Sequence, residues 1–455
     1  MAIRPKVPPS SQAKTSFDGG IHLFLPRSPS SGGKLPSSRI PGFYKLSVDE
    51  RVKIVKEFAG LTNEEAETLK KGLLPIEVAD HMIENVVGLW PLPLGIATNF
   101  LINGKDYLVP MAIEEPSVVA AASNAAKMAR ASGGFQAEAT DSIMISQIQI
   151  VGVKDLEEAR RSILGEKDKL LEAANEMDPL LIKLGGGARD LEVRIVETDA
   201  GPMVVVHLYV DTLDAMGANT VNTMAEGIAP MLERITGGKV YLRILSNLAD
   251  RRLARAKAKF AKSAIGGEEV VEGIMWAYRF AKYDPYRAAT HNKGIMNGVI
   301  AVARATGQDT RALEAGAHSY AARNGKYTSL TEYWVDENGD LWGSIELPVA
   351  VGTVGGVVRV HPIAKIALKI LGVTKAKELA QVIAAVGLAQ NFAALRALAT
   401  EGIQAGHMKL HARNIAMAVG ATPEEVDKIV EKMLREKRIN LDRAREILEE
   451  IRSGS

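Results

Sequence analysis

The sequence contains no cysteine among its 455 residues. That absence excludes disulfide bonds, thiolate nucleophiles and zinc sites with sulfur ligands. Aromatic residues make up only 5% of the chain, and the formal net charge is only +2. Nucleic-acid binders usually have a large positive excess and aromatic side chains that stack on bases, so this class of partner is disfavoured.

Clear signs of a membrane span or of a targeting signal are also missing. Residues 86–104 carry no charge, but prolines and glycines interrupt them, so we interpret them as core and not as a membrane span. The N-terminus lacks the charged-then-apolar pattern of a signal peptide. We therefore expect a cytoplasmic protein without a membrane partner, and its 47% of hydrophobic residues is enough for a large core.

Changes of composition and pattern divide the chain into five parts. Residues 1–36 are rich in Pro, Ser and Gly and are expected to form a loosely ordered arm. Residues 37–141 and 247–400 have mainly helical patterns and are expected to form one large domain in two pieces. Residues 142–246 have a different periodicity, and residues 401–455 form a charged helical tail.

The segment 142–246 alternates apolar and polar side chains with the period of β-strands. Two amphipathic helical patterns interrupt the strands, which gives the order strand, helix, strand, strand, helix, strand. This order is the split βαβ plan of ferredoxin-like domains. The predicted fold class is therefore α+β: a large, mainly helical domain with a ferredoxin-like insertion and a small C-terminal helical flap that is able to swing.

Residues 284–302 concentrate polar side chains on an otherwise apolar helical pattern. Arg287 and His291 share one helix face, and so do Lys293 and Asn297, because each pair is four residues apart. A lysine in such surroundings either acts on a substrate carbonyl or extends along the apolar surface to reach solvent. The pattern alone leaves both interpretations open.

Three other segments likewise have a functional and a structural interpretation. Glu114 and Glu115 precede a helix that starts with Pro116, so they either stabilise its dipole or place one carboxylate in a cleft. The small residues around Gly217 open a helix that either binds a phosphate or packs closely on its sheet. The basic run 251–262 is either a solvated helix face or a contact for the phosphates of a small ligand.

Signatures of several well-known enzyme classes are absent. The sequence has neither G-x-G-x-x-G nor G-x-x-x-x-G-K-[ST], which disfavours a conventional Rossmann domain and a P-loop. His407 and His411 are four residues apart, as in a zinc-binding pair. Met408 stands where the H-E-x-x-H motif needs glutamate, so we predict no metal site.

Six segments, taken in their order along the chain, match the motifs of one family. They are Glu84–Gly88, Glu114–Ser117, Asp214–Asn219, Thr290–Gly298, Gly352–Gly356 and Gly406–Asn414. Over residues 40–450 the sequence resembles the class II, soluble prokaryotic 3-hydroxy-3-methylglutaryl-coenzyme A (HMG-CoA) reductases. Each motif alone is unspecific, but the ordered set is highly specific.

The resemblance implies a ferredoxin-like domain that binds a nicotinamide dinucleotide, next to a large substrate-binding domain and a mobile flap. It implies interconversion of HMG-CoA and mevalonate plus coenzyme A through two hydride transfers with NAD(P)H. It further implies a homodimer, or a hexamer built as a trimer of dimers, with the active sites at the dimer interface.

The resemblance also implies four catalytic residues: Glu115, Lys293, Asp309 and His407. Lys293 would stabilise the oxyanion that forms as hydride reaches the thioester carbonyl. Asp309 would keep a buried Lys293 charged, and Glu115 would complete this proton network by sharing a proton with Lys293 in the second reduction. His407, on the flap, would protonate the coenzyme A thiolate.

Further residues are implied to bind the ligands. The substrate set is Glu84, Ser117, Arg287, Asn297, Gln390 and Asn391. The dinucleotide set is Asp178, Asp214, Met216, Gly217, Asn219, Thr223 and Asn247. Asp178 matches an acidic position that accepts the ribose 2′-hydroxyl in NAD-using members and repels a 2′-phosphate, so we predict NADH over NADPH.

Two other functions compete with this interpretation. One is a non-catalytic sensor of acyl-coenzyme A or nucleotides on the same fold, but a sensor has no need of all four catalytic residues. The other is a nucleic-acid binder that uses the ferredoxin-like sheet. Its predicted strands lack the paired aromatic residues that such sheets use for stacking, and the near-neutral charge opposes this function.

Overall fold

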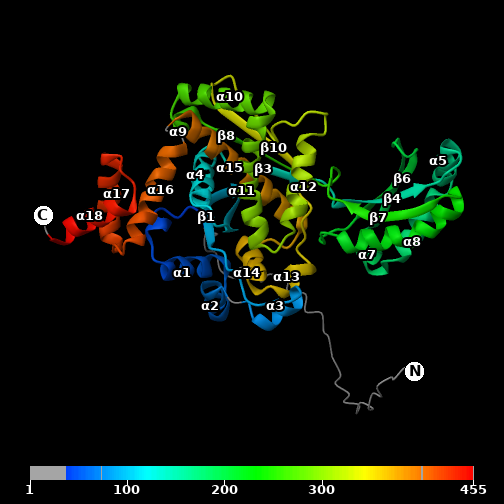
Figure 1. Cartoon of the computed structure of the whole chain (residues 1–455), viewed down its shortest axis with the longest axis horizontal. Coiled ribbons are helices and arrows are strands. Elements are labelled where there is room, and N and C mark those ends of the chain that lie inside the picture. Colours follow the sequence, from blue (N-terminus) through cyan, green and yellow to red (C-terminus); the bar gives the residue numbers. More distant parts are fainter. Residues whose placement is uncertain (1–36, 73, 401–402, 454–455) are drawn as a thin grey trace, which may run out of the picture. The chain divides into compact units, whose positions relative to one another are not determined.

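The computed structural model describes residues 37–72, 74–400 and 403–453. Two β-sheets and the helices packed on them form its framework (Figure 1). The predicted α+β class is therefore confirmed. Residues 37–455 form one compact unit by their internal contacts, so the division of the chain into five parts remains a prediction. The expected N-terminal arm lies outside the described residues.

Short helices begin the described part of the chain. They are η1 (Phe43–Lys45), α1 (Val48–Ala59), α2 (Asn63–Lys71) and α3 (Ile76–Met82). Ser47 and Thr62 begin α1 and α2 with capping boxes, in which a serine or threonine and a glutamate satisfy the free amides of the first turn.

The larger sheet has six strands in the order β2-β1-β3-β8-β10-β9. They are β1 (Leu94–Ile102), β2 (Lys105–Ala112), β3 (Phe135–Ala139), β8 (Leu253–Phe260), β9 (Thr331–Val335) and β10 (Leu341–Pro348). Strand β1 runs parallel to β3, and the other neighbours are antiparallel. This sheet lies within the part of the chain expected to be mainly helical, where the helices still hold more residues than the strands.

Strand β8 also corrects the interpretation of the basic run 251–262 as a helix face. Ala254, Ala256 and Ala258 are buried, with at most 3% of their surface exposed, whereas Lys257 between them is exposed. Alternation with a period of two is the pattern of a strand with one covered face. The charged side chains of β8, which are Arg255, Lys257 and Lys259, therefore lie on the open face of the sheet.

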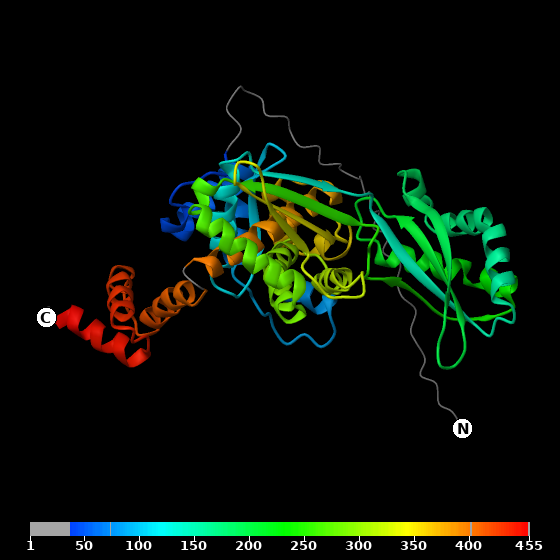
Figure 2. The same cartoon turned by 90° about the horizontal axis from the view of Figure 1, so that it is seen from above.

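Helices cover the other face of this sheet (Figures 1 and 2). They include α4 (Val118–Arg130), α10 (Glu268–Tyr283), α11 (Pro285–Ala305), α12 (Thr310–Ala321), α14 (Pro362–Leu371) and α15 (Ala376–Ala399). The short helices α9 (Lys262–Ile265) and α13 (Gly356–Val360) pack on α10 and α14. Helix α15 packs on β3, β8 and β10 and against α4, α10 and α11. It is long and apolar enough to cross a membrane, but 67% of its apolar window is buried inside the fold, as in a core helix.

The second sheet has four strands in the order β5-β6-β4-β7, and all neighbours are antiparallel. Its elements are β4 (Ile143–Val151), α5 (Leu156–Gly165), α6 (Lys167–Glu176), α7 (Pro179–Lys183), β5 (Gly187–Val196), β6 (Met203–Asp211), α8 (Ala218–Thr236) and β7 (Lys239–Ser246). The first and third of these strands are central, which is the ferredoxin-like arrangement. Val206 and Leu208 of β6 and Met224 of α8 belong to its apolar core.

Three helices end the described chain: α16 (Ile403–Ala418), α17 (Pro423–Glu436) and α18 (Leu441–Ser453). They have a core of their own, which includes Ala412, Ile429, Met433 and Ile447. Because this core is separate from the others, the helices can keep their structure during a movement. The movement of the predicted flap remains a prediction.

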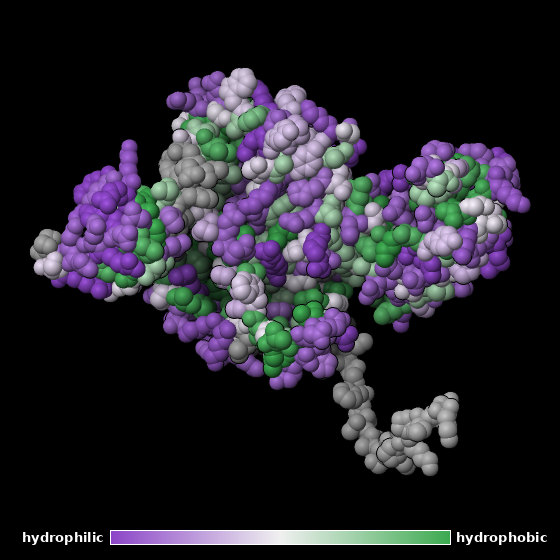
Figure 3. Space-filling view, in the orientation of Figure 1, coloured by the Kyte–Doolittle hydropathy of each residue, from purple (hydrophilic) through white to green (hydrophobic). Residues whose placement is uncertain are grey.

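Apolar side chains are exposed around α3 and α13, where Figure 3 shows green surface near the lower edge. Val87 and Trp90 follow α3 and are 103% and 89% exposed, and Val360 of α13 is 47% exposed. Exposed apolar groups of this kind mark interfaces or ligand grooves more often than free surface.

Candidate active site

Lys293 and Glu115 form the centre of the candidate active site. Nζ of Lys293 lies 2.8 Å from Oε2 of Glu115, although 178 positions separate the two residues. Asn297, one turn further along α11, donates from Nδ2 to Oε1 of Glu115 at 3.3 Å. Glu114 instead pairs with Arg304 at 3.2 Å. The geometry therefore favours the interpretation in which Glu115 serves a site.

Lys293 is not buried as the sequence led us to expect. Its side chain is 60% exposed, and that of Glu115 is 34% exposed. The apolar residues of α11 that carry the core, such as Ile295 and Val299, lie on the opposite face of the helix. An exposed ion pair contributes only about 0–1 kcal/mol to stability, so folding energy gives little reason for this pairing.

Within the described single chain, Asp309 forms no hydrogen bond or ion pair with Lys293, and its role of keeping this lysine charged stays a prediction. Asp309 is the N-cap of α12, where Oδ1 accepts a hydrogen bond from the amide of Ala312 at 3.0 Å. The same oxygen lies 3.9 Å from Nε of Arg311. In this structure Glu115 takes the role of partner to Lys293.

His407 falls in α16, but its side chain lies outside the described residues. Its predicted role as the acid for the thiolate therefore stays a prediction. Among the described residues, no group of three or more His, Asp or Glu side chains is arranged to hold a metal ion.

Arg287 is half-buried, and within the described chain its guanidinium has no hydrogen-bond or ion-pair partner. Burial lowers the pKa of this group. The side chain of Asp284 caps α11 through the amide of Arg287 at 2.7 Å and thereby fixes the backbone there. A half-buried cation without an anion is unfavourable, so this guanidinium is suited to a substrate carboxylate.

Ser117 has a backbone strain that fits a functional position. Its φ is 73°, in the left-handed region, and its side chain makes no capping bond at the start of α4. A non-glycine residue in this region costs about 1–3 kcal/mol and persists where the surroundings impose it. The strained turn lies two residues after Glu115 and sets the course of the chain behind that carboxylate.

Gln390 and Asn391, both on α15, differ in their freedom to bind a substrate. Oδ1 of Asn391 accepts hydrogen bonds from Thr331 Oγ1 and Tyr333 Oη, each at 2.9 Å. Asn391 thus supports the core, and its predicted role as a ligand-binding residue finds no support. Gln390 keeps a buried Oε1 without a partner, which suits a substrate hydroxyl.

His291 belongs to the same buried network. Its Nε2 lies 2.8 Å from Thr331 Oγ1 and 2.8 Å from Ser329 Oγ. Burial lowers the pKa of His291 to about 3, so the imidazole is neutral near pH 7. It holds α11 against β9 and is not placed to exchange protons with solvent. Glu84, also predicted for the substrate, lies exposed after α3.

Five of the seven predicted dinucleotide residues lie on the first turns of α8 or in the loop just before it: Asp214, Met216, Gly217, Asn219 and Thr223. Gly217, its N-cap, has a φ of 95°, and a Cβ there would lie 2.3 Å from Thr212 Cγ2. Gly217 therefore packs closely against Thr212, and it also leaves the first amides of α8 without a side-chain cap. Both interpretations of this glycine are compatible with the structure. Asn219 and Thr223 are exposed on the first turns of α8, and Asp178 reaches this helix through Thr220 Oγ1 at 3.5 Å.

Direct binding of the dinucleotide by Asp214 stays a prediction, and in this chain the carboxylate already has two partners. Its Oδ1 accepts a hydrogen bond from the amide of Ala376, and its Oδ2 accepts one from Lys375 Nζ, both at 2.9 Å. The carboxylate therefore caps α15 and anchors the loop before α8. Met216 lies half-buried in the same loop, and Asn247 is exposed at the end of β7.

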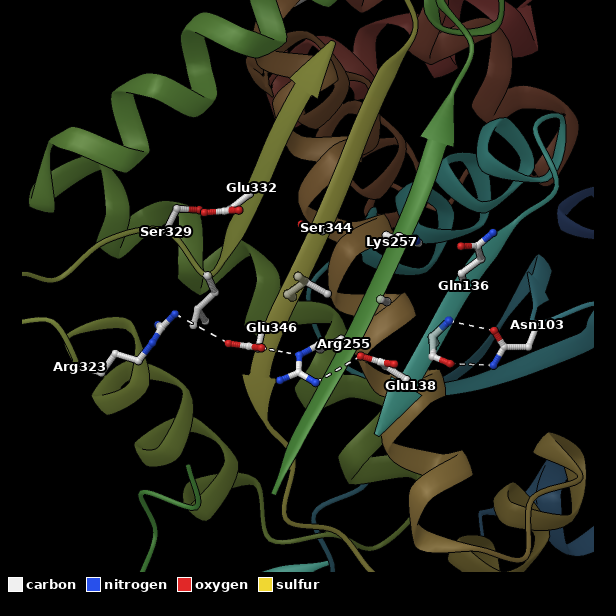
Figure 4. A pocket seen from close by; sticks show the side chains of 14 residues that line it. Asn103, Gln136, Glu138, Arg255, Lys257, Arg323, Ser329, Glu332, Ser344 and Glu346 are labelled. Atoms are coloured by element: carbon white, nitrogen blue, oxygen red, sulfur yellow. Dashed lines mark hydrogen bonds and ion pairs between the residues drawn. The ribbon is translucent and has the colours of Figure 1, made fainter. Parts of the chain in front are cut away.

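A separate polar hollow lies over the open face of β3, β8 and β10, with a volume of about 550 Å³ (Figure 4). At its centre Arg255 bridges Glu138 and Glu346. None of the predicted site residues lines it. The charge of Arg255 is therefore balanced by two carboxylates.

The site around Lys293 and the N-terminus of α8 define a class of enzyme. A lysine held by a carboxylate stabilises negative charge on a carbonyl oxygen, and a helix N-terminus on a ferredoxin-like sheet suits the phosphates of a dinucleotide. Both features belong to a nicotinamide-dependent oxidoreductase. The model of the hydroxymethylglutaryl-coenzyme A reductase family matches residues 47–412. The chain belongs to this family of NAD(P)H-dependent oxidoreductases.

Relatives from bacteria and archaea agree with this assignment. The chain is 65% identical over 417 residues to the 3-hydroxy-3-methylglutaryl-coenzyme A reductase of Archaeoglobus fulgidus, covering 92% of this chain and 95% of that one. It is 39% identical to the probable reductase of Borreliella burgdorferi, covering 82% and 87%. The class II reductase of Streptococcus pneumoniae, solved bound to NADPH in open conformations, is 43% identical with a TM-score of 0.76, covering 90% and 100%.

Proposed function

We propose that this protein interconverts HMG-CoA and mevalonate plus coenzyme A with two equivalents of NAD(P)H. The observation that carries the proposal is the Lys293–Glu115 pair, 2.8 Å apart, on a helix that also presents the unpaired guanidinium of Arg287. The substrate has a thioester carbonyl for the lysine and a free carboxylate for the arginine. One helix thus supplies a cation for each of these two groups.

In the first reduction, hydride adds to the thioester carbon, and Lys293 stabilises the negative charge that develops on oxygen. The resulting hemithioacetal collapses to an aldehyde and the coenzyme A thiolate, and His407 supplies the proton that this thiolate takes up. In the second reduction, hydride adds to the aldehyde carbon. Glu115 and Lys293 share the proton that converts the alkoxide to the alcohol of mevalonate, and Asp309 completes the proton network.

A steady-state assay tests the proposal. We expect the purified protein to oxidise a reduced nicotinamide dinucleotide only when HMG-CoA is added, and to consume two dinucleotides for each mevalonate formed. The competing function, a non-catalytic sensor, predicts binding of both ligands without turnover. Absence of oxidation with NADH and with NADPH would refute the proposal.

Arg287 should determine the affinity for the substrate. Replacing it by methionine removes the charge at similar length, and we expect the KM for HMG-CoA to rise about 10–100-fold because a charge-assisted bidentate contact is lost. Arg304→Met on the same helix is the matched control, since Arg304 pairs with Glu114. Equal KM values for the two variants would remove Arg287 from the substrate site.

The dinucleotide preference should depend on Asp178. We propose that NADH is preferred because the carboxylate accepts the ribose 2′-hydroxyl and repels a 2′-phosphate. Oδ1 of Asp178 also caps α7 through the amide of Leu181 at 3.0 Å, so Asp178→Asn keeps the cap and removes only the charge.

We expect Asp178→Asn to reduce the ratio of kcat/KM for NADH over NADPH about tenfold. The exposed neighbour Glu176, changed to glutamine, should leave the ratio unaltered. A wild-type ratio that favours NADPH would show that Asp178 does not select the cofactor.

We further propose that the protein acts in the cytoplasm as a homodimer or a trimer of dimers with active sites at the dimer interface. The exposure of Lys293 in the single chain supports a partner that completes the site. The exposed apolar residues around α3 and α13 support it as well. Measurement of the mass in solution tests the assembly.

A further inference from the structure

Arg252 is the only Lys, Arg, Asp or Glu that is fully buried among the residues that the structure describes, with 4% of its surface exposed. Within the described chain no carboxylate forms an ion pair with it, and Asp211 and Asp214 act on its charge only from a distance. Its Nη1 donates to Thr212 Oγ1 at 3.1 Å and to the carbonyl of Met216 at 3.0 Å, and its Nη2 donates to the carbonyls of Ala215 and Val351. Burial lowers its pKa to about 10, so the guanidinium remains charged near pH 7.

Three of these acceptors belong to the loop between β6 and α8. Carbonyls 215 and 216 immediately precede Gly217, the N-cap of α8. The first amides of a helix have no partner within the helix, and their direction follows from the backbone just before them. By holding these two carbonyls, Arg252 fixes the direction in which the N-terminus of α8 presents its amides.

The fourth acceptor lies on the other side, in the segment that follows β10. A Cβ on Gly352 would lie 2.6 Å from the amide nitrogen of Met216, so this segment and the loop before α8 are in backbone contact. Gln308 forms two hydrogen bonds with Gly352. Nε2 of Gln308 donates to the carbonyl of Gly352 at 2.9 Å, and the backbone amide of Gly352 donates to Oε1 of Gln308 at 2.8 Å. The next residue after Gln308 is Asp309.

We propose that Arg252 is a positioning residue that holds the dinucleotide loop, Thr212–Met216, in a fixed relation to the segment that carries Asp309. The inference rests on the proposed function, because it assumes that the dinucleotide binds at the N-terminus of α8. Arg252 touches neither ligand. It acts through the backbone of the loop and, through Gly352 and Gln308, joins the cofactor site to the proton network.

The variant Arg252→Met tests this role, because it keeps the length of the side chain and removes the donors. We expect the KM for the dinucleotide to rise about tenfold or more, since several charge-assisted hydrogen bonds that hold the loop are lost. The KM for HMG-CoA should stay within about twofold, because Arg287 and Lys293 are unaffected. Loss of a merely structural group would change both constants together.

Arg255→Met is the matched control. Arg252 directly precedes β8, and Arg255 lies within this strand, three residues later. The side chain of Arg255 is 43% exposed and pairs with Glu138 and Glu346. Both KM values of this variant should equal those of the wild type.

Hydrogen–deuterium exchange gives a readout that does not depend on catalysis. In Arg252→Met we expect faster exchange at the amides of Ala215 and Thr353, which bond to the carbonyls of Thr212 and Asp214 in the wild type. If the methionine variant does not fold, Arg252→Lys serves instead. A lysine keeps the charge but cannot reach all four oxygens, so it should give a smaller change of the same kind.

The possible failures can be told apart. Wild-type protein that neither binds nor oxidises a dinucleotide contradicts the proposed function, and the positioning role falls with it. If the wild type is active and Arg252→Met keeps its dinucleotide KM within about twofold, only the positioning role is wrong. A parallel rise of both KM values would also overturn it, since Arg252 would then merely stabilise the fold.

Discussion

Replacing Lys293 by methionine should lower kcat about 10²–10³-fold or more, because the methionine side chain has similar length but cannot donate to the developing oxyanion. The loss should fall on kcat more than on the KM for HMG-CoA, since the lysine contact strengthens as hydride arrives. The ion pair with Glu115 is exposed, so the free energy of unfolding of the variant should differ from that of the wild type by no more than about 1 kcal/mol.

The matched control for this experiment is Lys326→Met. Lys326 is also exposed and donates to the carbonyl of Tyr283, at the end of the helix before α11. It should retain wild-type kcat. A Lys293 variant with full turnover, or one that loses activity only because it unfolds, would contradict the assignment of Lys293 to the oxyanion.

Replacing Glu115 by glutamine should have an effect of comparable size, a loss of about 10²–10⁴ in turnover. Glutamine keeps the shape of the side chain and its acceptor for Asn297, but it cannot share a proton with Lys293. The proposed proton is needed when the aldehyde becomes an alcohol. We therefore expect a larger loss when the aldehyde is supplied as substrate than in the reduction of the thioester.

Glu114→Gln provides the neighbouring control, because Glu114 is 64% exposed and pairs with Arg304 outside the site. Its turnover should match the wild type. Equal losses in the two variants would mean that the acidic segment acts on α4 through its dipole, as the structural interpretation of these residues states. Equal losses in both half-reactions of Glu115→Gln would remove its special role in the second reduction.

Much of the fold could be predicted from local patterns. The alternation in 142–246 indicated the ferredoxin-like order of strands and helices. The capping boxes at Ser47 and Thr62 are local signals of the same kind, since a serine or threonine followed three residues later by glutamate is typical of a helix start. The strand β8 was not predicted, because its charged residues suggested a solvated helix face. Alanine at every second position, from Ala254 to Ala258, was the signal that could have identified it.

The site was less accessible, because its residues meet only through the tertiary fold. Periodicity placed Lys293 on α11 and Glu115 before α4, but no local pattern links positions 178 apart. Family resemblance suggested the pair and also a contact to Asp309 that the structure lacks. The exposure of Lys293 could not be predicted, since it depends on which face of α11 meets α15.

Other predicted site residues have partners in the fold that the sequence did not indicate, for a similar reason. Asp214 caps α15 through Ala376, 162 positions away, and Asn391 is held by Thr331 and Tyr333 in the core. The residues next to Asp214 and Asn391 in the sequence give no sign of these distant partners, so both side chains could be expected to bind a ligand. The sequence does not distinguish Arg252 from the other basic residues of its run, although it is buried and they are not.

A double-mutant cycle on the rate of hydride transfer, measured in single turnovers with Lys293→Met, Glu115→Gln and their combination, tests the central claim most directly. If the two groups act as one unit on the reacting oxygen, the double variant should lose little more than the more impaired single variant. Losses that simply multiply would show two independent groups and would contradict the shared site described here.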